Sequence, residues 1–322
     1  MELFPPLVYT LCHMEYYALA YYIFEKIEEP HLEVKKQKKF FKDLDASGRI
    51  YISEEGINGQ MSGSAEACEK YMAFLKQDPR FSKVHFKAHP VAEQIFPRMT
   101  VKYRKNLVAL GEQADAKEGG EHVSPQKWRE MLESDEDYLV LDVRNDYEWK
   151  IGHFEGATLP NLKNFRDFPA YADSLKDEVD PAKTKVMMYC TGGIRCELYS
   201  ALLKKRGFDK VFQLDGGVIN YGLTEGRKHW KGSLFVFDDR LACSIDNKPA
   251  EPISKCSFCD NPSDKYFNCA NMDCNELFLC CDSCALEREG ACSEKCLVAP
   301  RKRPFDPSKG NKPYRKKHLI EN

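Results

Sequence analysis

The sequence predicts an α/β protein with a smaller cysteine-rich region at its C-terminal end. Three observations lead to this prediction. Apolar strand-like segments alternate with amphipathic helical ones over about the first 245 residues. A glycine-bearing turn joins one buried strand directly to a helix, as in open α/β sheets. Nine of the fourteen cysteines lie between Cys256 and Cys296. We expect domains at residues 1–112 and 123–245, a linker at 113–122, a cysteine-rich module at 246–300 and a basic tail at 301–322.

Composition bears on whether the protein binds nucleic acid, is secreted or spans a membrane. The formal net charge of −2 gives no overall attraction to nucleic acid, so any such binding depends on local patches. The sequence shows neither a secretory leader nor a run of about 18 apolar residues that could span a membrane. We therefore expect a cytoplasmic protein, and in a reducing compartment clustered cysteines indicate metal ligands before disulfides.

The first region is expected to alternate strands and helices. We predict strands at residues 18–27, 49–53, 82–88 and 106–111, a helix opened by Pro30, and a second helix capped by Ser64. The order β-α-β-β-α-β is that of a ferredoxin-like (acylphosphatase-like) α+β sandwich. The first helix offers these core positions: Leu32, Val34, Phe40, Phe41 and Leu44.

The segment EGINGQMSG, residues 55–63, carries polar side chains among glycines between two predicted strands. Gly56 and Gly59 are expected to adopt positive φ. The segment is predicted to be either an ordinary tight hairpin or a loop that turns Glu55, Asn58 and Gln60 toward a substrate.

In the central region, Ser124 and Pro125 are typical of a helix N-terminus. YLVLDVR, KVMMYC and VFQLDGG are apolar enough to be buried parallel strands, with helices between them. The region is therefore predicted to form an open α/β domain with a parallel sheet.

The junction between KVMMYC and the following helix carries the strongest chemical signal. Cys190 is followed by Thr191, Gly192, Gly193 and Ile194, and then by Arg195. A helix N-terminus, converging backbone N–H groups and a guanidinium all favour a thiolate, so the pKa of Cys190 should be lowered. We expect Cys190 to be the nucleophile, assisted by Arg195, although it could also be a buried structural cysteine. Cys196 is either a resolving thiol for Cys190 or an inert buried one.

The spacing of this loop resembles rhodaneses. Cysteine-dependent phosphatases use C-x5-R, whereas four residues separate Cys190 from Arg195, a tighter loop suited to a single sulfur atom. LDVRNDYEWKIGHFEGA (141–157) and LDGG (214–217) also resemble rhodanese motifs, in the right order. Asp142 and Arg144 are expected to brace the sheet, and His153 to be a hydrogen-bonded structural residue.

The cysteine cluster falls into pairs with metal-ligand spacing. Two cysteines a few residues apart can hold one zinc ion from a tight turn, and four pairs could hold two ions. We expect a structural module with one or two zinc ions, and disulfides or free thiols are the alternatives. Spacing does not show which pairs share a metal, and Cys280 is left over. The predicted ligands are Cys256, Cys259, Cys269, Cys274, Cys281, Cys284, Cys292 and Cys296.

The tail from Arg301 has eight basic and two acidic residues. It is predicted either to contact the phosphate backbone of RNA or to be a solvated extension. The lysine run at residues 35–39 is a weaker candidate for the same role. The tail residues assigned to RNA are Arg301, Lys302, Arg303, Arg315, Lys316 and Lys317.

Together, EGINGQMSG, CTGGIRCE and the cysteine-rich end resemble the bacterial tRNA uridine hydroxylases over nearly the whole chain. This resemblance implies an oxygen-dependent oxidoreductase that makes 5-hydroxyuridine at the tRNA wobble position, with Cys190 as the essential cysteine. It implies tRNA and molecular oxygen as substrates, and the sequence contains no flavin or NAD motif. The electron donor and the oligomeric state are not predicted. The alternatives are a sulfurtransferase that carries a persulfide on Cys190 and a non-enzymatic RNA-binding scaffold.

Overall fold

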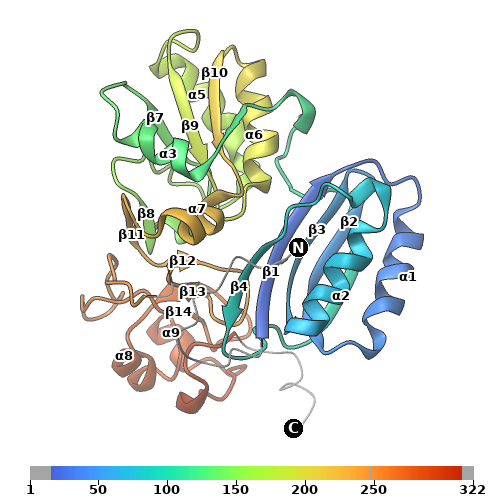
Figure 1. The fold of residues 1–322 in the computed structure, drawn as a ribbon. Helices are drawn as coiled ribbons and strands as arrows, with labels where there is room; N and C mark the ends of the chain where they lie inside the picture. The colour runs from blue at the N-terminus through green and yellow to red at the C-terminus, as the bar shows by residue number, and fades with distance from the viewer. Residues whose placement is uncertain (1–15, 247, 314–322) are drawn as a thin grey trace.

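The computed structural model describes residues 16–246 and 248–313. Figure 1 shows three parts that follow the chain: an N-terminal α+β domain, a central α/β domain beside it, and a cysteine-rich part below the central domain. This agrees with the predicted fold class. Among the described residues, no helix is long and apolar enough to cross a membrane.

The N-terminal domain is a five-stranded sheet with its helices on one face (Figure 1). The strand order β4-β1-β3-β2-β5 contains the ferredoxin-like core, and β5 is added parallel to β2. The packed face carries alternate residues such as Leu19, Ile52 and Met61, which meet Tyr71 of α2. The elements are β1 (Tyr16–Phe24), α1 (Pro30–Phe40), η1 (Phe41–Asp43), β2 (Ala46–Ser53), β3 (Gly56–Ser64), α2 (Ala65–Lys76), η2 (Pro79–Phe81), β4 (Lys87–Val91) and β5 (Met99–Tyr103).

Of the two predictions for EGINGQMSG, the loop was wrong and the tight hairpin was right in part. Its residues from Gly56 onward lie in β3, the middle strand of the sheet, and Glu55 lies in the two-residue turn of the hairpin that β2 and β3 form. Gly56 has φ +145° as expected, but Gly59 does not have positive φ. A Cβ at Gly59 would come within 2.1 Å of the Tyr21 ring, so glycine is needed there for packing across the strands.

The last two strands and one core position also need correction, whereas a predicted helix cap is confirmed. The last two strands form at β4 and β5, and not at residues 82–88 and 106–111. Leu32 is 52% exposed and not part of the core, whereas Val34 and Phe41 are buried. Ser64 caps α2 as predicted, because its hydroxyl accepts a hydrogen bond from the backbone N–H of Ala67 at 3.2 Å.

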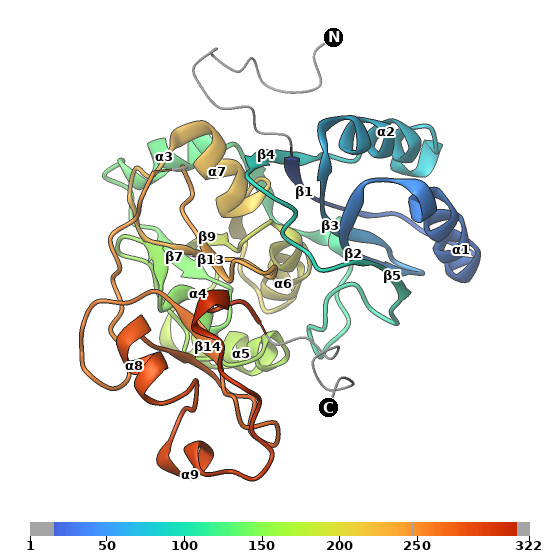
Figure 2. The ribbon, with the colours of Figure 1, turned by 90° about the horizontal axis from the view of Figure 1, so that it is seen from below.

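The central domain has a parallel sheet with the order β6-β10-β9-β7 and helices on both faces (Figure 2). Successive residues of β9 enter different cores: Met187 packs with Trp128, and Met188 with Leu198 and Leu202. Ser124 caps α3 by accepting from the N–H of Lys127 at 3.2 Å. The elements are β6 (Glu121–Val123), α3 (Pro125–Leu132), β7 (Leu139–Asp142), α4 (Asp146–Trp149), β8 (Gly152–Phe154), η4 (Phe165–Asp167), α5 (Phe168–Glu178), β9 (Lys185–Tyr189), α6 (Ile194–Lys205), β10 (Lys210–Leu214), α7 (Gly217–Glu225) and β11 (Trp230–Gly232).

The segment between these domains is not entirely without regular structure. Its last residues enter β6, which pairs with β10, and a short helix η3 (Ala116–Glu118) precedes them. The predicted linker therefore contributes an edge strand to the central sheet.

The cysteine-rich part consists of short elements joined by turns. It docks on the central domain, where the Tyr266 hydroxyl donates to the carbonyl of Tyr147 at 2.8 Å. The elements that follow β11 are β12 (Leu234–Phe235), β13 (Ala242–Cys243), β14 (Tyr266–Asn268), β15 (Leu277–Leu279), α8 (Asp282–Glu287), α9 (Glu294–Leu297) and η5 (Pro307–Lys309).

Candidate active site and metal centres

Cys190 lies at the point where β9 ends and α6 begins. Its side chain is fully buried, and its sulfur accepts a hydrogen bond from the backbone N–H of Gly193 at 3.1 Å. Gly193 has φ +100°, a conformation that disfavours residues with a Cβ, and this turn aims its N–H at the sulfur. We call residues 190–195 the Cys190 loop.

The surroundings of Cys190 favour its thiolate. Burial alone would raise its pKa, but a hydrogen bond from the Cys196 thiol, the charge of Arg195, and the N–H groups of Arg195 and Gly193 outweigh that cost. The pKa of Cys190 is lowered to about 5. The pKa of Cys196 is raised well above its usual value, chiefly by burial. At neutral pH the pair therefore consists of a thiolate and a neutral thiol that donates to it.

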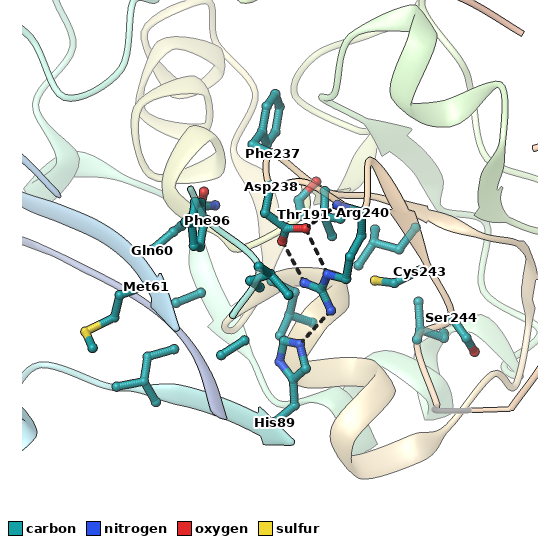
Figure 3. Close-up of a pocket in the computed structure, with 18 of the residues that line it drawn as sticks. Gln60, Met61, His89, Phe96, Thr191, Phe237, Asp238, Arg240, Cys243 and Ser244 are labelled. Carbon is teal, nitrogen blue, oxygen red and sulfur yellow. Dashed lines mark hydrogen bonds and ion pairs between the residues drawn. The ribbon is translucent and has the colours of Figure 1, made fainter. Parts of the chain in front are cut away.

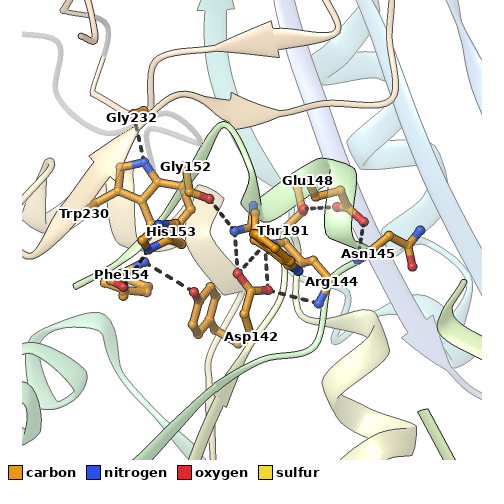
Figure 4. Close-up of polar contacts among 12 residues, drawn as sticks. Asp142, Arg144, Asn145, Glu148, Gly152, His153, Phe154, Thr191, Trp230 and Gly232 are labelled. Carbon is orange, nitrogen blue, oxygen red and sulfur yellow. Dashed lines mark hydrogen bonds and ion pairs between the residues drawn. The ribbon is translucent and has the colours of Figure 1, made fainter. Parts of the chain in front are cut away.

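Arg195 is held by a residue that the sequence analysis did not single out. Its guanidinium contacts both carboxylate oxygens of Glu148, at 2.5 and 2.8 Å. Thr191 donates its hydroxyl to the same carboxylate at 3.0 Å, and Figure 4 shows this carboxylate between Thr191 and Asn145. Glu148 is fully buried, and the Arg195 charge holds the pKa of its carboxyl low against the opposing effect of burial. Arg195 thus acts on the sulfur from a fixed position.

The Asp142–Arg144 pair braces the central domain, as predicted. Both side chains are fully buried, and Arg144 lies 2.6 Å from Asp142. Arg144 also donates to the carbonyl of Gly152 at 2.6 Å, which joins the end of β7 to β8 (Figure 4). His153 has its Nδ1 3.0 Å from the carbonyl of Phe154, consistent with the predicted structural role.

The LDGG motif supports the Cys190 loop from the other side. The N–H groups of Val218 and Ile219, at the start of α7, donate to the carbonyls of Cys190 and Thr191 at 3.0 and 3.1 Å. A Cβ at Gly217 would lie 2.5 Å from the Cys190 carbonyl oxygen. Glycine at this position lets α7 pack directly against the loop.

The N-terminal domain closes the site. A cavity of about 300 Å³ lies between the helix-free face of its sheet and the Cys190 loop. Hydrogen bonds between described residues span this boundary: Lys87 donates to the carbonyl of Gly192 at 2.8 Å, the Tyr22 hydroxyl to Glu197 at 2.7 Å, and Arg49 to the carbonyl of Phe237 at 2.5 Å. Sequence reasoning missed Lys87 and Tyr22, and no local pattern marks either residue. One of the two predictions turned Glu55, Asn58 and Gln60 toward a substrate. Asn58 and Gln60 do line this cavity, but from a strand, whereas Glu55 does not line it and accepts a hydrogen bond from the N–H of Leu107.

A second, smaller cavity of about 50 Å³ adjoins the first, and the two share Ala20, Gln60, Thr191, Ile219 and Phe237. Figure 3 shows its polar end, where Arg240 is paired with Asp238 at 2.7 Å and lies 3.3 Å from His89. Most of the remaining wall is apolar.

The predicted metal ligands come together in two groups. Within each group the four sulfur atoms all lie within 4.8 Å of one another, close enough to ligate one ion. The pairs interleave along the chain, so the first pair joins the third and the second joins the fourth. Cys280 is buried, outside both groups, and its thiol donates to the carbonyl of Cys281. The groups are Cys256, Cys259, Cys281 and Cys284, and Cys269, Cys274, Cys292 and Cys296.

The first residues of the basic tail contact the cysteine-rich part itself. Arg301 pairs with Asp273 at 2.5 Å, Lys302 contacts Glu289, and Arg303 donates to the carbonyl of Cys269 at 3.0 Å. Their charges are thus partly used within the protein. The other predicted RNA contacts, Arg315, Lys316 and Lys317, lie outside the described residues.

Comparison with known proteins gives matches for each part. Residues 16–107 match the UPF0176 acylphosphatase-like domain, 124–222 the rhodanese-like domain and 231–297 the family described as rhodanase C-terminal. The rhodanese-like domain of an Anabaena sp. protein is 22% identical, covering 34% of this chain and 78% of that one, with a TM-score of 0.29.

Full-length relatives are much more similar. The tRNA uridine(34) hydroxylase of Chlamydia trachomatis serovar D is 60% identical over 307 residues, 95% of this chain and 94% of the relative. That of Chlamydia pneumoniae is 57% identical over 309 residues, 95% of each chain. This chain belongs to the tRNA uridine(34) hydroxylase family.

Proposed function

We propose that this protein is an enzyme that hydroxylates uridine 34 of tRNA, with Cys190 as its nucleophile. The observation that carries the proposal is that Cys190 lines a cavity between two domains, in a loop whose N–H donors and guanidinium favour a thiolate. Its relatives are named for this reaction on tRNA. The target base must leave its stack to reach Cys190, as in other enzymes that act on nucleobases.

The chemistry that we infer uses the thiolate to activate the base. Attack of the Cys190 sulfur on C6 of uracil forms an S–C6 bond and moves the π electrons toward C5 and O4. The electron-rich C5 then forms a C–O bond with an oxygen atom from molecular oxygen. The other oxygen atom leaves as water, using two protons and two electrons from a donor. Loss of the C5 proton and of the thiolate restores the C5–C6 double bond.

A sulfurtransferase is the second candidate. The Cys190 loop surrounds one sulfur atom with backbone N–H donors, which also suits a persulfide. In that case Cys190 would carry sulfane sulfur to an acceptor, or a persulfide would take part in the oxidation.

The experiment that tests the function is mass spectrometry of tRNA nucleosides. Purified protein, unmodified tRNA, oxygen and a reductant should yield 5-hydroxyuridine, and a strain without the gene should lack it. Unchanged nucleosides together with robust thiosulfate:cyanide activity would replace the proposal by sulfur transfer. A covalent Cys190 adduct with RNA containing 5-fluorouridine would support attack at C6.

The cysteine groups and the tail are assigned supporting roles. All-thiolate sets of this compactness suit tetrahedral zinc, so we propose one structural zinc ion in each group. The buried side chains around them are few, so bound zinc would stabilise this part of the chain. We assign the basic residues from Arg301 onward to RNA phosphates and place the protein in the cytoplasm, with its tRNA substrate.

A further inference from the structure

The face of the N-terminal sheet that carries no helix is turned toward the Cys190 loop (Figure 1). Side chains alternate between the two faces of a strand. Leu19, Tyr21 and Ile57 pack under the helices. The residues that alternate with them along each strand therefore face the Cys190 loop. These residues are largely polar or aromatic, which is unusual for a sheet face that another domain covers.

Two rows of side chains cross this face. Tyr22, Asn58 and Tyr51 are direct neighbours on β1, β3 and β2. The next row consists of Lys87, Ala20, Gln60 and Arg49, on β4, β1, β3 and β2. Neighbours in such rows lie about 5 Å apart. Ala20 has a short side chain, so the second row has a hollow between the ammonium of Lys87 and the amide of Gln60. All seven residues of the two rows line the Cys190 cavity.

The polar groups at this hollow have hydrogen-bonding capacity to spare. The side chains of Asn58 and Gln60 are partly exposed, and neither is hydrogen-bonded to another residue in the described part of the chain. Lys87 is only 4% exposed, and among residues 16–246 and 248–313 its ammonium makes one hydrogen bond, to Gly192. An ammonium has three N–H donors and no acceptor, so further donors remain. The ammonium lies 5.0 Å from the centre of the Tyr22 ring, which keeps it in place.

We propose that Lys87, Asn58 and Gln60 read the edge of the base above Cys190, and that Lys87 excludes cytosine. This rests on the proposed function and assigns its base specificity to the N-terminal domain. Tyr22 and Tyr51 supply aromatic surface of the kind on which sheets stack unpaired RNA bases.

Uracil and cytosine differ in the group on C4 of the pyrimidine. Uracil has an acceptor there, O4, whereas cytosine has an amino donor. Carboxamides such as those of Asn58 and Gln60 can turn to suit either base. The ammonium of Lys87 can only donate, so it binds O4 and leaves a cytosine amino group without a partner. Donation to O4 also stabilises the charge that thiolate attack on C6 would place on that oxygen.

The test compares binding of two anticodon stem-loop RNAs that differ only in uridine or cytidine at position 34. The unaltered protein should prefer the uridine RNA. Lys87→Gln provides an acceptor as well as donors, so the preference should fall roughly ten-fold, the effect of losing one discriminating hydrogen bond. Lys231→Gln alters a surface lysine paired with Glu155 outside the cavity and should leave the preference unchanged.

Two further variants serve if Lys87→Gln does not fold. Gln60→Glu and Asn58→Asp keep the shape of each side chain but replace an amide by an acceptor, and should weaken uridine binding more than cytidine binding. Alkylation of Cys190 in each variant checks that the loop is intact. An unaltered protein without base preference, or variants that all keep it, would overturn the proposal. Mass spectrometry of the same RNAs after turnover tests hydroxylation separately, so failure of the function and failure of the base reading are distinguishable.

Discussion

The ammonium of Lys87 and the backbone carbonyl of Gly192 form a 2.8 Å hydrogen bond between residues 105 positions apart in the chain. It joins the edge of the N-terminal sheet to the loop that holds the nucleophile. The N-terminal domain thus covers the rhodanese-like loop. Between the two lies a cavity that is lined by Cys190 and is large enough for a base.

Glu148 should be essential for the stability of the site. In Glu148→Gln, the buried Arg195 charge loses its carboxylate, so the free energy of unfolding should fall by about 3 kcal/mol, as when one partner of a buried pair is removed. Urea denaturation of purified protein measures the change. Glu155→Gln removes the charge of an exposed pair with Lys231 and is the control. It should unfold at nearly the same urea concentration as the unaltered protein. Equal stability of the two variants would show that Glu148 does not hold the loop.

Gly217→Ala should displace the Cys190 loop. Its new Cβ would lie 2.5 Å from the Cys190 carbonyl oxygen, on a residue with φ +67°. Gly226→Ala is a matched control, because its φ is +69° but no atom lies within 4 Å of the new Cβ. Both variants incur backbone strain, but only Gly217→Ala should slow alkylation of Cys190 at neutral pH and abolish hydroxylation. Equal effects in the two variants would mean that backbone strain alone, and not contact with the loop, is responsible.

Metal content should follow the two cysteine groups. Elemental analysis of reduced protein is expected to give two zinc ions per chain, and Cys259→Ser or Cys274→Ser should each remove one. Cys280→Ser is the control, since Cys280 belongs to neither group, and it should keep both ions. Removal of zinc by a chelator should lower the melting temperature of the protein. Zinc-free reduced protein would refute the assignment.

The tail should contribute to RNA binding through charge. Replacing Arg315, Lys316 and Lys317 by glutamine should weaken tRNA binding and flatten the plot of log affinity against log salt by about 2 to 3 units. Three exposed lysines of the central domain, Lys163, Lys176 and Lys183, provide an equal change of charge as a control. A salt dependence that the tail substitutions leave as steep as before would make the tail a solvated extension.

Sequence patterns predicted much of this architecture because the signals are local. Buried strands, helix caps such as Ser64 and Ser124, and the turn after Cys190 depend on neighbouring residues. The β3 strand was misread because Gly56, Asn58 and Gly59 favour turns. Gly59 is accommodated there by the ring of Tyr21 on the adjacent strand, a contact that no local pattern reveals.

The residues of the site also divide into those that local sequence identifies and those that only distant contacts identify. Cys190 and Arg195 could be identified because strand, glycines and helix follow one another in the chain. Glu148 and Lys87 could not be assigned, because their importance comes from burial against residues 47 and 105 positions away. The pairing of the cysteines also depends on how the turns fold together, so the spacing predicted eight ligands but not their two groups.

The most direct test of the central claim is the pH dependence of Cys190 alkylation. In protein whose other cysteines are protected, the rate of reaction with iodoacetamide should be constant at neutral pH and fall by half near pH 5, where the thiolate becomes protonated. A midpoint near 8.5, the value of an unperturbed cysteine, would contradict the account.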